Sequence, residues 1–306
     1  MTQSTTPAPL RFLAIGECMA ELAPGDSADQ LRLGFAGDTF NTAFYLRQLL
    51  TEAEVRYFSR VGQDSLSDRM TTMMRAAGVD TTFVAADPKR SVGMYLISLK
   101  DGERSFSYWR DSSAARLLAS DRGALDRAME ETGLIYFSGI TLAILDAAGR
   151  ATLLDAVAQA RRAGRTIAFD SNLRPRLWAA APEMTQTIMA AAQVSDIVLP
   201  SFDDEAVHFG DADPDATADR YLRAGAETVI VKNGAGPVHY RSGGGQGVVT
   251  PPVAQVVVDT TAAGDSFNAG FLAGRASGLP VDQAILSGAR VAARVIGHKG
   301  ALVPLT

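Results

Sequence analysis

The chain has 306 residues, of which 47% are hydrophobic and 21% are charged, with a formal net charge of −5. A chain of this length buries roughly three-quarters of its unfolded surface, and its single cysteine and three histidines exclude an internal disulfide and a usual closed zinc site. The negative charge and the absence of a long apolar run favour a cytoplasmic protein that acts on small molecules, with neither nucleic acid nor a membrane as partner.

Short apolar runs alternate with helical patterns along the chain, which predicts an α/β fold with a mostly parallel sheet and crossover helices. The runs predicted as buried strands are residues 12–15, 56–61, 134–138, 166–170, 196–199, 228–232 and 255–259. The segments with helical spacing are residues 39–50, 65–77, 146–163, 182–194, 216–224 and 281–296. Because no linker or repeat divides the chain, we expect a single domain over residues 1–306.

One region breaks this alternation. Residues 92–100 and 104–110 have the pattern of two strands joined at Asp101-Gly102, a dipeptide typical of a tight hairpin turn. Residues 19–35 have few helical signals and could supply further strands. We expect the segments at about 19–36 and 91–112 to form a small antiparallel sheet that covers a ligand as a lid. The alternative is a rigid extension at the edge of the main sheet.

The strongest chemical signal is residues 256–270, VVVDTTAAGDSFNAG. Here a strand is predicted to lead into small residues and then a helix, so that the N–H groups of Ala262, Ala263 and Gly264 point outward and bind an anion. A bound phosphate would repel a carboxylate at Asp265, so an acid at this position suggests a role in the reaction. The role that fits is general base for a hydroxyl that attacks phosphorus. The alternative is a first-turn acid that only favours the helix.

Residues 259–270, DTTAAGDSFNAG, resemble the C-terminal signature of the ribokinase-like (PfkB) carbohydrate kinases, and residues 36–43, AGDTFNTA, resemble the N-terminal glycine signature of that family. The resemblance extends from about residue 12 to residue 304. It implies a three-layer ribokinase-like fold with a β-sheet lid, Asp265 as the catalytic base, and ATP and Mg²⁺ as cofactors.

Within the family, residues 15–22, 107–110, 170–178 and 203–205 resemble the 2-keto-3-deoxygluconate kinases. This likeness implies ATP-dependent phosphorylation of the terminal hydroxyl of that sugar acid. The implied substrate contacts are Gly37, Asn41, Tyr95, Tyr108, Arg110, Arg174 and Asp265.

The residues themselves also agree with an acidic sugar. Tyr108 and Arg110 are two positions apart, so they share one face of a predicted strand, and Arg174 follows a strand at the sheet edge where ligands bind. Two guanidinium groups match a carboxylate, which ribose or fructose would not require. The alternative for Tyr108 and Arg110 is a solvated hairpin face.

Nucleotide binding has a weaker signal. Residues 228–237, TVIVKNGAGP, have the pattern of a strand that ends in a Gly-rich turn, but a dinucleotide fingerprint is incomplete there and the chain has no P-loop. The nucleotide contacts implied by the resemblance are Asn172, Lys232, Asn233, Gly234, Gly236, Ala262 and Gly264.

The family places an Asn-x-x-Glu motif near the magnesium ion. Glu205 matches the acid of that motif, whereas Phe202 stands at the Asn position. The resemblance therefore implies Glu205 as the metal contact, acting through water. The alternative is a first-turn acid in a helix that begins after Ser201.

Two other functions are weighed against the sugar-acid kinase. One is another sugar kinase of the same family, such as a fructokinase, a ribokinase or a dehydro-deoxygluconokinase. The other is a non-catalytic sugar-binding protein on this scaffold, against which the intact Asp265 argues. A monovalent cation as a further cofactor and a homo-oligomer are both left open.

Overall fold

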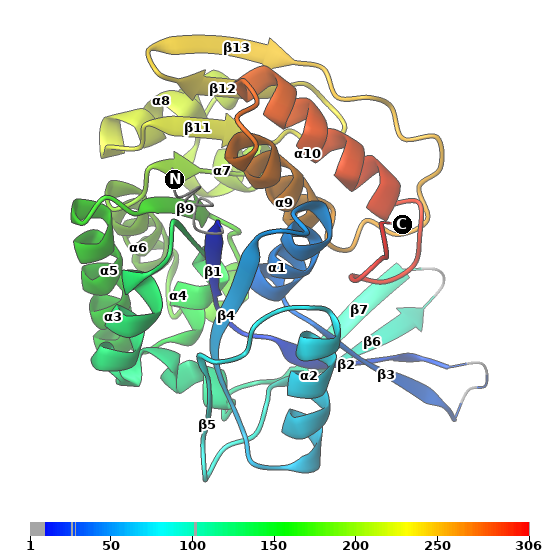
Figure 1. Ribbon diagram of the computed structural model, residues 1–306. Helices are drawn as coiled ribbons and strands as arrows, with labels where there is room; N and C mark the ends of the chain where they lie inside the picture. The colour runs from blue at the N-terminus through cyan, green and yellow to red at the C-terminus, as the bar shows by residue number, and fades with distance from the viewer. Residues whose placement is uncertain (1–9, 26, 28, 101–102, 306) are drawn as a thin grey trace, which may run out of the picture.

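The computed structural model of the protein describes residues 10–25, 27, 29–100 and 103–305, and Figure 1 shows its large sheet with helices on both faces. Across that sheet the strands are β13 (Gly245–Val249), β12 (Val238–Ser242), β11 (Thr228–Val231), β10 (Ile197–Val198), β9 (Thr166–Asp170), β8 (Leu134–Ser138), β1 (Arg11–Ile15), β4 (Glu54–Val61) and β5 (Val84–Ala86). Neighbouring strands from β11 to β5 are parallel, whereas β12 and β13 run antiparallel to their neighbours.

Helices pack on the two faces of this sheet over two separate hydrophobic clusters. One face carries η1 (Ala114–Ser120), α3 (Arg122–Glu130), α4 (Gly139–Ile144), α5 (Ala147–Arg162), η2 (Pro175–Leu177), α6 (Ala181–Gln193), α7 (Phe202–Phe209) and α8 (Pro214–Ala224). The other face carries α1 (Asp38–Leu49), α2 (Ser65–Ala76), α9 (Ala263–Ala276) and α10 (Val281–Val295). The expected three-layer α/β fold is confirmed.

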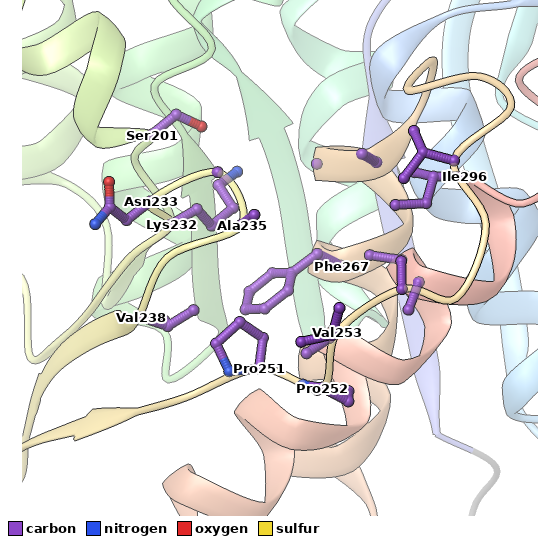
Figure 2. A pocket seen from close by; sticks show the side chains of 18 residues that line it. Ser201, Lys232, Asn233, Ala235, Val238, Pro251, Pro252, Val253, Phe267 and Ile296 are labelled. Atoms are coloured by element: carbon purple, nitrogen blue, oxygen red, sulfur yellow. The ribbon is translucent and has the colours of Figure 1, made fainter.

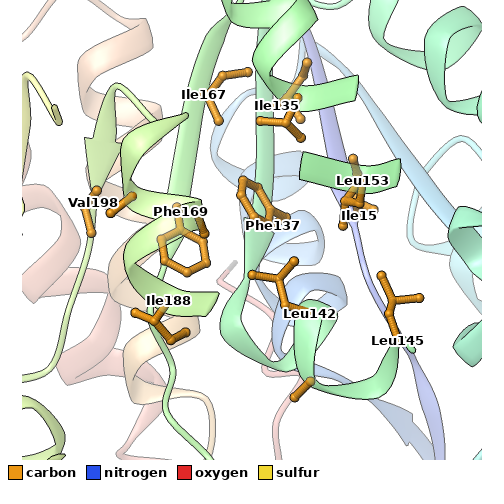
Figure 3. Close-up of a cluster of buried hydrophobic side chains, with 14 of the residues drawn as sticks. Ile15, Ile135, Phe137, Leu142, Leu145, Leu153, Ile167, Phe169, Ile188 and Val198 are labelled. Carbon is orange, nitrogen blue, oxygen red and sulfur yellow. The ribbon is translucent and has the colours of Figure 1, made fainter. Parts of the chain in front are cut away.

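Strand β1 shows why these apolar runs form central strands. Side chains alternate along a strand, so Leu13 and Ile15 join the first cluster while Phe12 and Ala14 join the second. In the first cluster, shown in Figure 3, side chains from several strands meet those of the covering helices. Burial on both faces therefore requires the continuous apolar pattern seen in the sequence.

The predicted helices are present, with ends that differ by one or two residues. Helix α8 begins two residues earlier than expected, at Pro214, because the Asp213 side chain caps it by accepting from the N–H of Ala216 (2.8 Å). Helices α3 and α4 were not predicted; they have 9 and 6 residues, so the helical spacing repeats over few turns. No helix among the residues described here is long and apolar enough to cross a membrane.

The predicted strand at residues 255–259 is wrong. Val256 and Val257 are 60% and 61% exposed and lie outside the sheet. The N–H groups of Val258 and Asp259 instead donate to the carbonyl of Ile296, just after α10, at 2.7 and 3.1 Å. Valine favours a strand only where a neighbouring strand offers backbone partners, and here a helix end provides them.

The expected small sheet is confirmed as a second sheet, which projects from the main body below α1 in Figure 1. Its strands, in order, are β3 (Leu31–Ala36), β2 (Met19–Pro24), β6 (Met94–Lys100) and β7 (Glu103–Trp109). The pairs β2–β3 and β6–β7 are antiparallel, and the β2–β6 pair that joins them is parallel. The predicted turn at Asp101-Gly102 lies outside the described residues.

Candidate active site

Asp265 lies in the first turn of α9 and faces the first turn of α1. Asn41 donates from Nδ2 to Oδ2 of Asp265 (2.7 Å), and the Thr42 hydroxyl donates to the Asp265 carbonyl (3.2 Å). The N–H of Gly37 donates to Oδ1 of Asn41 (3.3 Å) and so helps to orient the amide. The two segments that carry the sequence signatures, more than 200 positions apart in the chain, therefore meet at one carboxylate.

The surroundings of Asp265 suit a general base. Burial raises the pKa of Asp265 to about 7, and the nearby negative charge of Asp38 adds to the shift. Asp170 raises this pKa further, while the Asn41 hydrogen bond and the charge of Lys232 lower it. A carboxylate that titrates near neutral pH is a stronger base than an ordinary aspartate and is still ionised in a useful fraction of molecules.

The pH dependence of activity should follow this pKa. We expect kcat/KM to rise with pH up to about 7 and then level off, because a general base must be ionised to accept a proton.

Stability should respond in the opposite direction. The pKa of Asp265 is higher in the folded protein than its ordinary 3.8, so its contribution to stability is complete below that value and is lost as the pH rises through about 7.

The measurement is a pH series of kcat/KM together with urea unfolding of the protein and of Asp265→Asn. The variant should lack this pH-dependent component of stability. A flat kcat/KM across neutral pH would mean that the titrating base is not Asp265.

Asp38, the first residue of α1, is held by the ends of β8 and β9. Ser138 donates from Oγ to Oδ2 of Asp38 (2.5 Å), and Asn172 donates from Nδ2 to the same oxygen (2.8 Å). Burial raises the pKa of Asp38 as well. Asn172 thus turns toward α1 and is absent from the cavity that Lys232 lines, so its position does not support the nucleotide contact implied by the resemblance.

A cavity of about 490 Å³ lies between the small sheet, the start of α4 and the segment around η2 that follows β9. It is lined by Glu17, Met19, Gly37, Asp38, Phe106, Tyr108, Arg110, Asp111, Ile140, Arg174, Pro175, Arg176 and Leu177. Four of the predicted substrate contacts, Gly37, Tyr108, Arg110 and Arg174, are therefore brought together. We call this space the polar cavity.

Two other predicted substrate contacts lie behind this lining. Asn41 is bound to Asp265 and Gly37, as described above. Tyr95 is buried, its ring centroid lies 5.9 Å from that of Tyr108 with the two rings tilted by 36°, and its hydroxyl donates to Glu21 on β2. Its position supports Tyr108 but does not place it on the wall of the polar cavity.

Three arginines, Arg110, Arg174 and Arg176, line the polar cavity, and the two that were predicted as substrate contacts differ in their surroundings. Arg110 is 7% exposed and donates from Nη2 to Oε2 of the buried Glu17. Arg174 has a side chain that is 52% exposed, donates to the carbonyl of Leu173 (2.6 Å), and lies 3.8 Å from Asp204. Arg110 is therefore already paired with a buried carboxylate, whereas Arg174 is the more accessible cation.

A second cavity, of about 360 Å³, lies beside the N-terminal end of α9, and Figure 2 shows Phe267, Pro251 and Val253 around it. Its lining is Ser201, Lys232, Asn233, Gly234, Ala235, Val238, Pro251, Pro252, Val253, Ala254, Val257, Ala263, Gly264, Phe267, Ala289, Ala292, Ala293 and Ile296. Most of these side chains are apolar, and the polar groups gather near Lys232. We call this space the apolar cavity.

Four of the predicted nucleotide contacts, Lys232, Asn233, Gly234 and Gly264, line the apolar cavity. Lys232 is buried and donates from Nζ to Asp170 (3.3 Å) and Asn268 (3.1 Å). Gly236 closes the turn by donating its N–H to the Asn233 carbonyl (2.7 Å) and is not part of the lining.

The first turn of α9 connects the two cavities through short contacts. Gly264 lines the apolar cavity, and the next residue, Asp265, accepts from Asn41, which in turn accepts from Gly37 of the polar-cavity lining; Asp265 and Asn41 themselves are in neither lining. Ala262 caps the helix with a φ of 60°, in the left-handed region. The N–H of Ala263 donates to the Thr260 carbonyl (3.2 Å). This hydrogen bond competes with the one that the same N–H was expected to donate to an anion. The anion-binding roles of Ala262 and Gly264 stay predictions.

Glu205 is fully buried and lines neither cavity. Its carboxylate accepts from Ser171 (2.6 Å), from Arg220 (2.7 Å) and from the hydroxyl of Tyr221 (3.0 Å). Burial raises the pKa of Glu205, and these partners act against that shift. Ser201 precedes α7 without a side-chain capping bond. The structure therefore places Glu205 in a buried ion pair and does not offer it as a metal ligand.

Replacing Glu205 should consequently cost stability more than metal affinity. We expect Glu205→Ala to lower the free energy of unfolding by about 3 kcal/mol or more, the scale of a broken buried ion pair, because Arg220 loses a buried partner. Asp203→Ala, an exposed acid in the same helical turn, is the matched control. Urea unfolding and a magnesium titration of activity measure both effects. A large shift in magnesium dependence with unchanged stability would restore Glu205 as a metal contact.

Sequence reasoning missed Glu17, Asp38 and Ser138 as residues of this site. Asp38 had a visible signal, because it is a polar residue directly after the glycine at which a strand leads into a helix. Glu17 follows β1 in the same way. The polar side chains that follow parallel strands meet at one sheet edge, and that rule could have found Glu17 after β1 and Ser138 at the end of β8.

Comparisons with known proteins agree with this geometry. Residues 11–306 match the family described as pfkB family carbohydrate kinase. The 2-dehydro-3-deoxygluconokinase of Haemophilus influenzae is 38% identical over 298 residues, covering 94% of both chains. The 2-dehydro-3-deoxygluconokinase of Escherichia coli K12 is 36% identical over 303 residues, covering 96% of this chain and 97% of the relative.

Solved structures share the fold. A PfkB protein from Polaromonas sp. JS666 superposes with a TM-score of 0.82 at 28% identity, covering 94% of this chain and 96% of that one. The 2-dehydro-3-deoxygluconokinase of Thermotoga maritima has a TM-score of 0.83 at 21% identity, covering 97% and 96%. With two family signatures that meet at one carboxylate and a family match across the chain, the protein belongs to the pfkB family of carbohydrate kinases.

Proposed function

We propose that the protein is an ATP-dependent kinase that phosphorylates the terminal hydroxyl of 2-keto-3-deoxygluconate. This sugar acid is also called 2-dehydro-3-deoxygluconate, so the alternative of a dehydro-deoxygluconokinase is the same activity under its other name. One observation carries the proposal. Asp265, whose pKa is raised to about 7, directly follows Gly264 of the apolar cavity, which also contains the buried Lys232, and is joined through Asn41 to Gly37 of the polar cavity, whose lining includes three arginines. The names of the relatives that are 36–38% identical support the same substrate.

The residues set the orientation in which the sugar binds. Arg174 binds the carboxylate of the sugar, and the terminal hydroxyl lies beside Asp265. Asp265 accepts the hydroxyl proton while the hydroxyl oxygen forms a bond to the γ-phosphorus of ATP and the bond from that phosphorus to the departing ADP oxygen breaks. Lys232 and the N-terminal end of α9 stabilise the charge that develops on the transferred group.

The apolar cavity fits a nucleotide, because its apolar walls suit a base and its polar end at Lys232 and Gly264 suits phosphates. The residues fit a protein-held metal less well. In the part of the chain that the structure describes, no three His, Cys, Asp or Glu side chains are placed to hold an ion together. Magnesium neutralises triphosphate charge when bound, and it commonly binds through substrate phosphates and waters. The proposed reaction has no step that uses Glu205, which lines neither cavity.

We also propose that the small sheet, residues 19–36 and 91–112, acts as the lid of a single kinase domain. Tyr108 and Arg110 belong to this region and line the polar cavity, so the sugar can draw the lid closed and exclude water from the phosphoryl acceptor. We expect hydrogen exchange of amides in β6 and β7 to slow markedly when the sugar acid is added, and much less with ATP alone. Equal protection in the ligand-free protein would indicate a rigid sheet extension.

The proposal is tested by an ADP-release assay with 2-keto-3-deoxygluconate, fructose and ribose. We expect kcat/KM for the sugar acid to exceed that for either neutral sugar by about 10²-fold or more, on the scale of charge-assisted recognition. A preference for fructose would favour the alternative of a fructokinase, and a Rhizobium leguminosarum fructokinase is 30% identical to this chain. Binding of the sugars without ADP release would indicate a non-catalytic protein.

A further inference from the structure

Asp38 lies on the wall of the polar cavity, in the same lining as Arg110 and Arg174. It is the first residue of α1, so its carboxylate is also favoured by the positive end of that helix. The chemistry described so far assigns it no contact with substrate. A carboxylate in such a cavity accepts hydrogen bonds and repels other carboxylates, which makes it a natural partner for a hydroxyl group.

The hydrogen bonds of Asp38 leave it capacity for a ligand. Ser138 and Asn172 both donate to a single oxygen, Oδ2, and the N–H of Thr39 also hydrogen bonds to the carboxylate. An ionised carboxylate accepts about four hydrogen bonds, so these three donors fix its orientation without using all of its acceptor capacity.

The backbone at Asn172 indicates that this orientation is built with some strain. Asn172 has a φ of 30°, and in the described residues it and Ala262 are the non-glycine residues with positive φ. Its N–H donates to Oδ1 of Asp170 (3.2 Å) while its side chain reaches Asp38. Strained conformations of this kind persist where the surroundings enforce them, and they cluster at functional sites. Neither strained residue lines a cavity, but Asn172 holds Asp38, which lines the polar cavity, and Ala262 directly precedes Ala263, which lines the apolar cavity.

We infer that Asp38 is a substrate-binding residue that accepts a hydrogen bond from a secondary hydroxyl of the sugar acid and so orients the sugar for Asp265. The inference rests on the proposed function. It also follows from the charges on the cavity wall: the accessible guanidinium of Arg174 attracts the carboxylate end of the sugar, and Asp38 repels that end. A sugar acid bound in the reverse direction would place its carboxylate against Asp38.

The experiment compares Asp38→Asn with the unaltered protein, using 2-keto-3-deoxygluconate and its C4 epimer, 2-keto-3-deoxygalactonate. Kinetics give KM for each sugar acid and for ATP, and calorimetry without ATP gives sugar affinity independently of turnover. We expect KM for 2-keto-3-deoxygluconate to rise about tenfold or more, with the ATP KM within about twofold and the preference between epimers reduced. Asp68→Asn, an exposed first-turn acid of α2, is the matched control and should leave all of these values unchanged.

A second variant covers the case in which Asp38→Asn does not fold. Asn172→Gly keeps the left-handed backbone and removes one of the donors that orient Asp38, so it should raise the sugar KM in the same direction by about threefold or more. Unchanged sugar affinity and epimer preference in the folded variants would overturn the inference. If the unaltered protein binds only neutral sugars, the proposed function fails, and loss of that binding in Asp38→Asn would still support a hydroxyl contact.

Discussion

Asp265→Asn is expected to lower kcat by at least about 10²-fold while the affinity for ATP changes by no more than several-fold. Asparagine has nearly the same size and can still accept the hydrogen bond that Asn41 donates to Asp265. What it loses is the capacity to accept a proton and hold it. The loss should therefore appear in the chemical step, and steady-state kinetics with a separate measurement of nucleotide binding would show it.

The matched control for this variant is Asp282→Asn. Asp282 occupies the first turn of α10 as Asp265 occupies the first turn of α9, so both substitutions remove a favourable interaction with a helix N-terminus. The control should keep normal turnover. If Asp265→Asn retained near-normal turnover as well, the proton would have to be accepted by another group, and the alternative of a mere first-turn acid would hold.

Much of the fold could be predicted because burial on both faces leaves a simple pattern. Strand β8 is buried at all five positions, and its ends agree with the predicted run. The segment 255–259 shows where this reasoning fails. Its valines have the propensity of a strand, but the pattern cannot tell whether a partner strand lies beside it, and here the carbonyl of Ile296 provides the hydrogen bonds.

Only the residues of the catalytic centre that belong to sequence motifs could be predicted. Asp265 and Asn41 belong to signatures with fixed residue types, and the structure joins them directly. The pairing of Arg110 with Glu17 spans 93 positions and depends on how the small sheet packs, which no local pattern encodes. The ion pair of Glu205 could not be predicted for a related reason: its partner Arg220 lies in the next helix, so the burial of Glu205 becomes visible only in three dimensions.

Arg110 and Arg174, two of the three arginines that line the polar cavity, should give different results when each is replaced. We expect Arg174→Ala to weaken binding of the sugar acid by roughly 1.5–3 kcal/mol, the scale of a hydrogen bond to a charged group, or about 10- to 150-fold in KM. A neutral sugar should lose less. The unfolding free energy should change little, because the Arg174 side chain is half exposed and its nearest acid, Asp204, is 3.8 Å away.

Arg110→Ala should instead lower the free energy of unfolding by about 3–5 kcal/mol, because it leaves the buried carboxylate of Glu17 without its partner. The double variant Glu17→Gln with Arg110→Met removes both charges and should recover much of that stability, because no unpaired buried charge is left. Urea unfolding of the three variants, with KM for a carboxylated and a neutral sugar, separates the two roles. An equal rise in KM for both sugars in Arg174→Ala would show that this arginine does not bind the carboxylate. An unchanged free energy of unfolding in Arg110→Ala would show that the pair with Glu17 contributes nothing to stability.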